Sequence, residues 1–179
     1  MRSKLFMAAA IAAALIIATH ARGVYAGQEG QHPAQGHGHD GHAQGMSERG
    51  DRVMGFDHEK TAHHFLLYAD GGAIEVAANS ADDAENRDRI RKHLRHIARM
   101  FAEGNFKAPM LIHEQTPPGV PVMRRLKAEI RYEYAETGRG ARVSIKTGNA
   151  EALAAVHDFL RFQIKDHQTG DTTEVRPRN

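Results

Sequence analysis

The feature that most restricts the fold of this chain is a pattern that occurs twice: two alternating segments around a tight turn, followed by an amphipathic segment. In the first copy, HHFLLYADGGAIEVAAN, the residues Ile74, Val76 and Ala78 fall on alternate positions. Alternation with a period of two predicts a strand with one buried face. The glycines of the DGG sequence at 70–72 supply the positive φ angles of a short hairpin.

The second copy, LKAEIRYEYAETGRGARVSIKTGN, repeats this arrangement. Ile130, Tyr132 and Tyr134 alternate with charged residues, and Val143 and Ile145 do so after a glycine-containing turn. We therefore expect a second hairpin with one apolar face.

An amphipathic helix is predicted after each hairpin. Ser80 or Asp82 is the expected N-cap of the first helix, which stops at Gly104, and Asn149 is that of the second, which closes near Gly170. Apolar residues with helical spacing predict one buried stripe on each helix. These residues are Ile90, Leu94, Ile97 and Phe101 in the first helix, and Leu153, Val156, Leu160 and Ile164 in the second.

The order of elements is thus ββα, loop, ββα. It predicts an α+β fold, a two-layer sandwich with a four-stranded antiparallel sheet and both helices on one face. The other sheet face is expected to carry Glu75, Arg131, Glu133, Arg142 and Lys146. The proline-rich stretch 107–123 is predicted to be a long, functional loop in which 110–112 could pair briefly as a strand.

The N-terminus has the pattern of a secretory signal peptide, cleaved after Ala26. Arg2 and Lys4 precede an apolar run at 5–18 that is short for a membrane span, and Val24-Tyr25-Ala26 has small residues at −3 and −1. The alternative is an uncleaved anchor. The pattern predicts a periplasmic or secreted protein, with residues 1–26 as the signal peptide.

Residues 27–52 are predicted to be a His/Gly-rich disordered segment, because no apolar side chain larger than Ala occurs between Gly30 and Met46. The α+β domain is expected at 53–170 and a C-terminal tail at 171–179. On this view, deleting residues 27–50 leaves the fold intact.

Charge and cysteine content narrow the function. The full chain has 24 Lys and Arg and 22 Asp and Glu residues, and residues 1–26 hold Arg2, Lys4 and Arg22 but no acidic residue. The rest of the chain therefore has 21 basic and 22 acidic residues, which nearly cancel. A neutral chain gives no argument for nucleic acid or an anionic membrane as a partner. With no cysteine, disulfides and thiolate metal sites are excluded.

Histidine is abundant, with 13 residues, and imidazole is the commonest metal ligand in proteins. His93, His96 and Met100 are spaced i, i+3, i+7, so they share a helix face. Imidazole with thioether suits copper, particularly Cu(I). On spacing alone, the alternative is favoured that His93 and His96 are boundary residues beside the apolar stripe and that Met100 fills the core.

A second group precedes or enters the first strand. His58 and His63 could form a ligand pair with Asp57 nearby, but His63 and His64 are expected on opposite faces of a strand. The alternative is a polar surface around the start of the strand. His113, at the head of the proline-rich stretch, could be a metal ligand or a general base.

The remaining histidines are divided between core, surface and tail. His157 lies beside the second helical stripe and is interpreted as a satisfied core residue, whereas His167 is interpreted as a surface residue near a helix C-terminus. His37, His39 and His42 lie in the glycine-rich segment, where His-rich tracts bind Cu(II), Ni(II) or Zn(II) weakly.

These features favour a periplasmic metal-binding or metal-buffering protein, with copper ahead of zinc and nickel as the metal ion. No H-E-x-x-H, G-x-S-x-G, phosphate-binding glycine loop or C-x-x-C-H occurs, so we lean against an enzyme. The alternatives are a small-molecule or haem-binding domain that uses the stretch 107–123, and an interaction module. We expect no nucleic acid and no membrane contact after cleavage, and leave a homodimer open.

The chain resembles a group of small secreted proteobacterial proteins of no established activity over nearly all of residues 53–171. The resemblance lies in the stretches MGFDHEKTAHHFLLYADGGAIEV, IRKHLRHIARMFAEGNFKAPMLIHEQTPPGVPVM and AVHDFLRFQIKDHQTGD. Look-alikes are sometimes labelled aspartate carbamoyltransferase. The chain lacks the S-x-R-T phosphate-binding loop of that enzyme and is too short for its two domains. The resemblance therefore implies a single secreted domain and no particular reaction.

Overall fold

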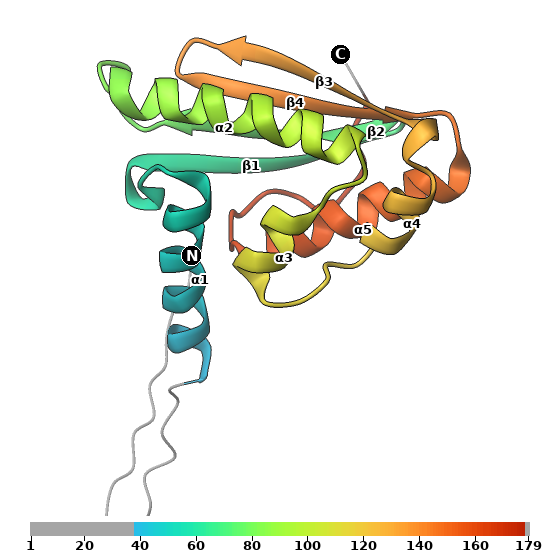
Figure 1. The fold of residues 1–179 in the computed structure, drawn as a ribbon, viewed down its shortest axis with the longest axis horizontal. Helices are drawn as coiled ribbons and strands as arrows, with labels where there is room; N and C mark the ends of the chain where they lie inside the picture. Colours follow the sequence, from blue (N-terminus) through green and yellow to red (C-terminus); the bar gives the residue numbers. More distant parts are fainter. Residues whose placement is uncertain (1–37, 178–179) are drawn as a thin grey trace, which may run out of the picture. The chain divides into compact units, whose positions relative to one another are not determined.

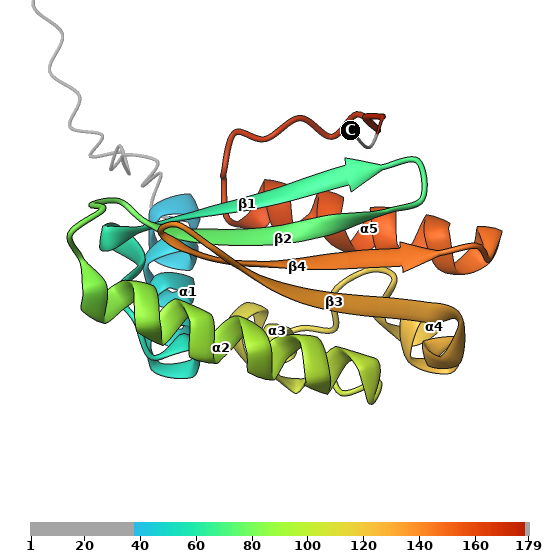
Figure 2. The same cartoon turned by 90° about the horizontal axis from the view of Figure 1, so that it is seen from above.

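One antiparallel sheet with the strand order β1-β2-β4-β3 forms the centre of the fold (Figures 1 and 2). The computed structural model describes residues 38–177, and within that range no helix is long and apolar enough to span a membrane. The strands are β1 (Thr61–Tyr68), β2 (Gly71–Ala78), β3 (Ile130–Thr137) and β4 (Gly140–Thr147). The predicted α+β fold is confirmed.

Both hairpins form where the sequence predicts them. Tyr68 pairs with Gly71 across the first turn, and Thr137 pairs with Gly140 across the second. Gly71 has a φ of +145°, and a Cβ at this position would lie 2.0 Å from the carbonyl oxygen of Ile145. Only glycine therefore lets β2 approach β4 this closely.

The helices α2 (Ala84–Ala102) and α5 (Ala150–Asp166) pack on the sheet face that carries Phe65, Ile74 and Val143. Their predicted stripes are buried, except that Leu153 is only half-buried. Asn149 caps α5 as expected, but the N-cap of α2 is Asp83 rather than Ser80 or Asp82, since its carboxylate accepts the backbone N–H of Asn86.

The opposite sheet face is charged, as expected from the alternation. Glu75 pairs in register with Arg142, and Arg131 pairs with Lys146. At the sheet edge, the segment after α5 runs beside β1, where Arg176 forms a parallel bridge with Tyr68 (Figure 2). This segment covers an edge that would otherwise be open to pairing with another chain.

The stretch 107–123 is not an irregular loop, and the brief strand at 110–112 is wrong. It contains α3 (Lys107–His113) and the start of α4 (Val120–Arg125). Proline is tolerated in the first turn of a helix, where its missing N–H has no partner to lose. Pro109 and Pro121 occupy such positions, so they are helix-start residues rather than loop residues.

The expected disorder of residues 27–52 is wrong from Gly38 onward, because α1 (Gly38–Met54) is a helix; residues 1–37 lie outside the described part. Arg49 Nε donates to the carbonyl oxygen of Ile112 over 2.9 Å, and Met46 is only 6 % exposed. Contacts with α3 therefore stabilise α1 as a helix, and they outweigh the low helix propensity of its glycines. The folded part begins before residue 53. Two short 3-10 helices complete the fold, η1 (His58–Lys60) and η2 (Lys127–Glu129).

Candidate metal site

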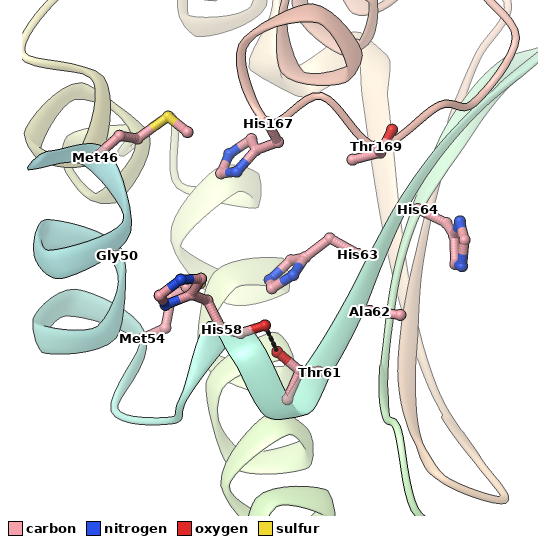
Figure 3. Close-up of a pocket in the computed structure, with 10 residues that line it drawn as sticks. All are labelled: Met46, Gly50, Met54, His58, Thr61, Ala62, His63, His64, His167 and Thr169. Carbon is pink, nitrogen blue, oxygen red and sulfur yellow. Dashed lines mark hydrogen bonds between the residues drawn. The ribbon is translucent and has the colours of Figure 1, made fainter. Parts of the chain in front are cut away.

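A cavity of about 280 Å³ lies between α1, the start of β1 and the segment after α5 (Figure 3). Three imidazole rings point into it, and two methionine side chains of α1 lie on its opposite wall. Its lining residues are Met46, Gly50, Met54, His58, Thr61, Ala62, His63, His64, His167 and Thr169. We call this space the histidine cavity.

His63 occupies the centre of the site. It faces the helices from β1, because it pairs in register with the inward-facing Val76. Its ring stacks on Phe56 and on His167, with centres 5.9 Å apart in each pair. Nε2 of His63 is buried and has no hydrogen-bond partner among residues 38–177. Burial lowers the pKa of His63 to about 4, so the ring is neutral at pH 7 and retains a free lone pair.

His167 reaches the cavity from the C-cap of α5. Its ring lies nearly parallel to that of His63 and meets the ring of His113 edge-on at 5.0 Å. Burial, assisted by the neighbouring His113 and His63, lowers the pKa of His167 to about 3. The interpretation of His167 as a surface residue is therefore wrong. The sequence feature that indicates its burial is its position three residues after Ile164, which continues the buried stripe of α5.

His58 is oriented by a carboxylate. Its Nδ1 lies 3.0 Å from both carboxylate oxygens of Asp51, and its backbone N–H donates to Asp51 Oδ1 over 2.9 Å. An ionised carboxylate only accepts hydrogen bonds, so the proton lies on Nδ1 and Nε2 is available to a metal. A carboxylate behind a histidine in this way is a common second shell of metal sites.

Met46, Gly50 and Met54 line the cavity from one face of α1, at spacings of four residues. Met46 is almost fully buried, and Met54 packs against the core. Gly50 leaves room between the two thioethers, since a Cβ there would lie 3.1 Å from the methyl carbon of Met54. The helix that the sequence does not predict therefore contributes both sulfur atoms of the cavity.

The three histidine rings of the cavity are not arranged as the ligands of one metal ion. Among the described residues, only Asp51, Asp57 and His58 place three histidine or acidic ligand atoms within 4.8 Å of one another. A metal held at about 2 Å by one nitrogen of each of two rings keeps the ring centres about 5–6 Å apart, and those of His63 and His167 are 5.9 Å apart. The separation of these two ring centres is therefore in the range for two rings that bind one ion.

The helix face His93, His96 and Met100 is arranged differently from the expected site. His93 contacts Phe56 edge-on at 5.6 Å, and burial lowers its pKa to about 4. His96 is exposed, with Nδ1 2.9 Å from a guanidinium nitrogen of Arg99. Met100 Sδ accepts a long contact of 3.5 Å from Asn105 Nδ2. His93 and His96 line a shared hollow, but Met100 does not join them there.

The other predicted ligands have separate surroundings. His64 points to the opposite side of β1, where Nδ1 lies 3.0 Å from Asp171 Oδ1 (Figure 3). His113 is buried, with Nδ1 2.5 Å from Asp166 Oδ2 and Nε2 3.0 Å from Gln163 Oε1. His37 lies outside the described residues, and so do the side chains of His39 and His42.

His157 is the satisfied core histidine that its position predicts. Its Nε2 lies 2.9 Å from the carbonyl oxygen of Tyr68 and 3.0 Å from that of Gly71. This ring holds the first hairpin against α5 and has no access to the histidine cavity. Nε2 of His63, in contrast, has no hydrogen-bond partner among residues 38–177.

A second, smaller cavity of about 60 Å³ lies behind the histidine cavity, and we call it the apolar cavity. Most of its lining comes from core residues of β1, β2, α2, α3 and α5. Within residues 38–177, both cavities are lined by Met54, His63 and His167. They form the partition between the two spaces.

Comparisons of the chain with protein-family models, with curated proteins and with solved structures found no match.

Proposed function

We propose that the protein binds copper in the histidine cavity, with His63 and His167 as the central ligands and His58, Met46 and Met54 as the further donors. The observation that carries this proposal is the buried, unpartnered Nε2 of His63, which faces two other imidazoles. A buried polar atom without a partner costs free energy, on the order of 1–3 kcal/mol. A metal ion that accepts its lone pair removes this cost.

The donor set favours Cu(I) over harder ions. Thioether sulfur is a soft ligand that selects Cu(I), whereas imidazole suits copper, zinc and nickel alike. Two methionines line the cavity and three histidine rings point into it. Of the two carboxylates grouped with His58, that of Asp51 accepts a hydrogen bond from His58 and that of Asp57 accepts the backbone N–H of Glu59. The signal-peptide pattern of residues 1–26 and the absence of cysteine fit copper handling in a periplasmic or secreted setting.

Haem is a less suitable occupant. Ligand sites for molecules of that size measure hundreds of Å³ and are mainly apolar. The apolar cavity has about 60 Å³, and the larger histidine cavity has a lining of mixed polarity. The space beneath α3 is therefore too small for the haem alternative.

The test is a competition titration of Cu(I) against a chromophoric Cu(I) chelator under anaerobic, reducing conditions. The full chain carries His32, His37, His39 and His42 replaced by glutamine, so that the His-rich segment does not contribute. His63→Gln should weaken Cu(I) binding by roughly tenfold or more, since second-shell changes alone cost 10–100-fold. Met54→Leu should weaken Cu(I) more than Zn(II).

His64→Gln is the matched control, because it changes the same residue type one position along β1 but on the opposite face. It should leave Cu(I) affinity unchanged. Equal affinities for the parent, His63→Gln and His64→Gln proteins would contradict the proposal.

A further inference from the structure

The partition formed by Met54, His63 and His167 gives the proposed copper site two sides. One side faces the histidine cavity, from which the metal enters, and the other faces the apolar cavity. Of the five proposed donors, these three line both spaces, so a small molecule in the apolar cavity would lie next to a metal that they hold. Metal sites with three protein ligands keep a further position for an exogenous ligand, and the proposal therefore requires that these three, of the five donors, bind the metal.

We propose that copper bound at this partition takes a small, uncharged diatomic ligand, of the dissolved-gas class, from the apolar cavity. This inference rests on the proposed copper site and adds a ligand to it. The step is coordination alone: a lone pair of the ligand forms one bond to Cu(I), no bond breaks, and no proton moves.

Size restricts what the apolar cavity can hold. Its volume of about 60 Å³ is several times the roughly 10–15 Å³ that one water molecule needs on the same measure. A diatomic molecule fits such a space, whereas an aromatic cofactor does not. The walls come from sheet and helix side chains that are themselves buried, including Val76, Ile97 and Phe159.

Charge restricts the ligand further. Among the described residues, no Lys, Arg, Asp or Glu lines the apolar cavity. Moving an isolated ion into such a space is strongly unfavourable without a counter-charge. An anion or a cation is therefore a poor occupant, and an uncharged molecule is the suitable class.

One buried donor faces this space without an acceptor. Gln163 is 3 % exposed, and its Oε1 lies 3.0 Å from Nε2 of His113. Its Nε2 has no hydrogen-bond partner among residues 38–177. Gln163 lines the same cavity as His63 and His167, so its N–H groups are available to the outer atom of a ligand bound to the metal.

Carbon monoxide is the probe, because it binds Cu(I) without redox chemistry and its stretching band reports its surroundings. Cu(I) is first titrated into the full-length protein with the four glutamine replacements in the His-rich segment. Carbon monoxide is then added, and the infrared band and the affinity are measured. We expect one copper-dependent band. In Gln163→Leu, which removes the donor, the band should shift to higher wavenumber.

Ala108→Leu fills the apolar cavity from α3 without touching the histidine cavity. It should keep Cu(I) affinity but lower carbon monoxide affinity by about tenfold or more, which corresponds to about 1.4 kcal/mol. Ala154→Leu, at an exposed position of α5, is the matched control and should change neither. Circular dichroism confirms the fold of each variant.

The outcomes separate the two proposals. Failure of Cu(I) to bind overturns both. If Cu(I) binds but no carbon monoxide band appears, the copper site stands and the ligand proposal is overturned. The same holds if neither Ala108→Leu nor Gln163→Leu changes the band or the carbon monoxide affinity. A cavity that holds only water gives this last result.

Discussion

The imidazole rings of His63 and His167 lie nearly parallel, with centres 5.9 Å apart, although one belongs to the first strand and the other follows the last helix. Nε2 of His63 has no hydrogen-bond partner among residues 38–177, whereas His58, His64, His96, His113 and His157 each contact a polar partner. The pair therefore brings a buried imidazole nitrogen without a partner next to a second imidazole ring.

His63→Leu should stabilise the metal-free protein or leave it unchanged, while it removes Cu(I) binding. The substitution eliminates a buried nitrogen without a partner, and such an atom costs about 1–3 kcal/mol. Urea unfolding measures the difference. His157→Leu is the control and should destabilise, since it removes the buried hydrogen bond between this ring and the carbonyl oxygens of the first hairpin. A loss of stability in His63→Leu as large as that in His157→Leu would mean that His63 is a structural residue.

Asp51→Asn should lower Cu(I) affinity by about 10–100-fold, because Asp51 fixes the His58 ring and its tautomer. The asparagine keeps the size of the side chain but removes its charge. Asp171→Asn makes the same change beside His64, on the outer face of β1, and should leave the affinity unchanged. Chelator competition on the two variants checks this, and equal effects would remove Asp51 from the site.

The stability of the metal-free protein should fall as the pH drops from about 6.5 towards 4. Burial holds the pKa of His63 and His93 at about 4 and that of His167 at about 3, below the ordinary value of 6.5. Below pH 6.5 the unfolded chain thus binds more protons than the folded one. Each group then costs about 1.4 kcal/mol of unfolding free energy per pH unit.

Above pH 6.5 this contribution to stability is fully present, because the three rings are neutral in both states. Urea unfolding curves at several pH values measure the slope. The double variant His63→Leu and His167→Leu should flatten it. A stability that stays constant from pH 7 to pH 4.5 would contradict the burial of these rings.

Deleting residues 38–50 should destabilise the fold, in contrast to the expectation from the sequence. The deletion removes the buried Met46 and the hydrogen bond from Arg49 to α3. Met46→Ala alone should cost about 2–5 kcal/mol if its burial resembles that of other core methionines. Thermal melts of the deletion and point variants measure these effects, and unchanged melting temperatures would show that α1 does not stabilise the domain.

The sheet and its two long helices could be predicted because their signals are local. A period-two alternation and a helical stripe such as Ile90, Leu94 and Ile97 each lie within one short stretch of sequence. Helix α1 could not be predicted in this way. Its glycines give a weak local preference, and its stability depends on contacts of Met46 and Arg49 with distant residues.

The site was only partly predictable for the same reason. The alternation in β1 correctly separates His63 from His64, and the spacing of His58 and His63 is compatible with a ligand pair. No local pattern connects them to His167, because the contact depends on how the end of α5 packs beside β1. The helical spacing of His93, His96 and Met100 is a strong local signal, but the fold gives these residues separate partners.

The most direct test of the copper site is a crystal structure of the Cu(I)-loaded protein with anomalous diffraction data at the copper absorption edge. We expect an anomalous peak at the partition, within coordination distance of His63 and His167. A principal peak at Asp51, Asp57 and His58 without His63, or on the face of His93 and His96, would contradict it.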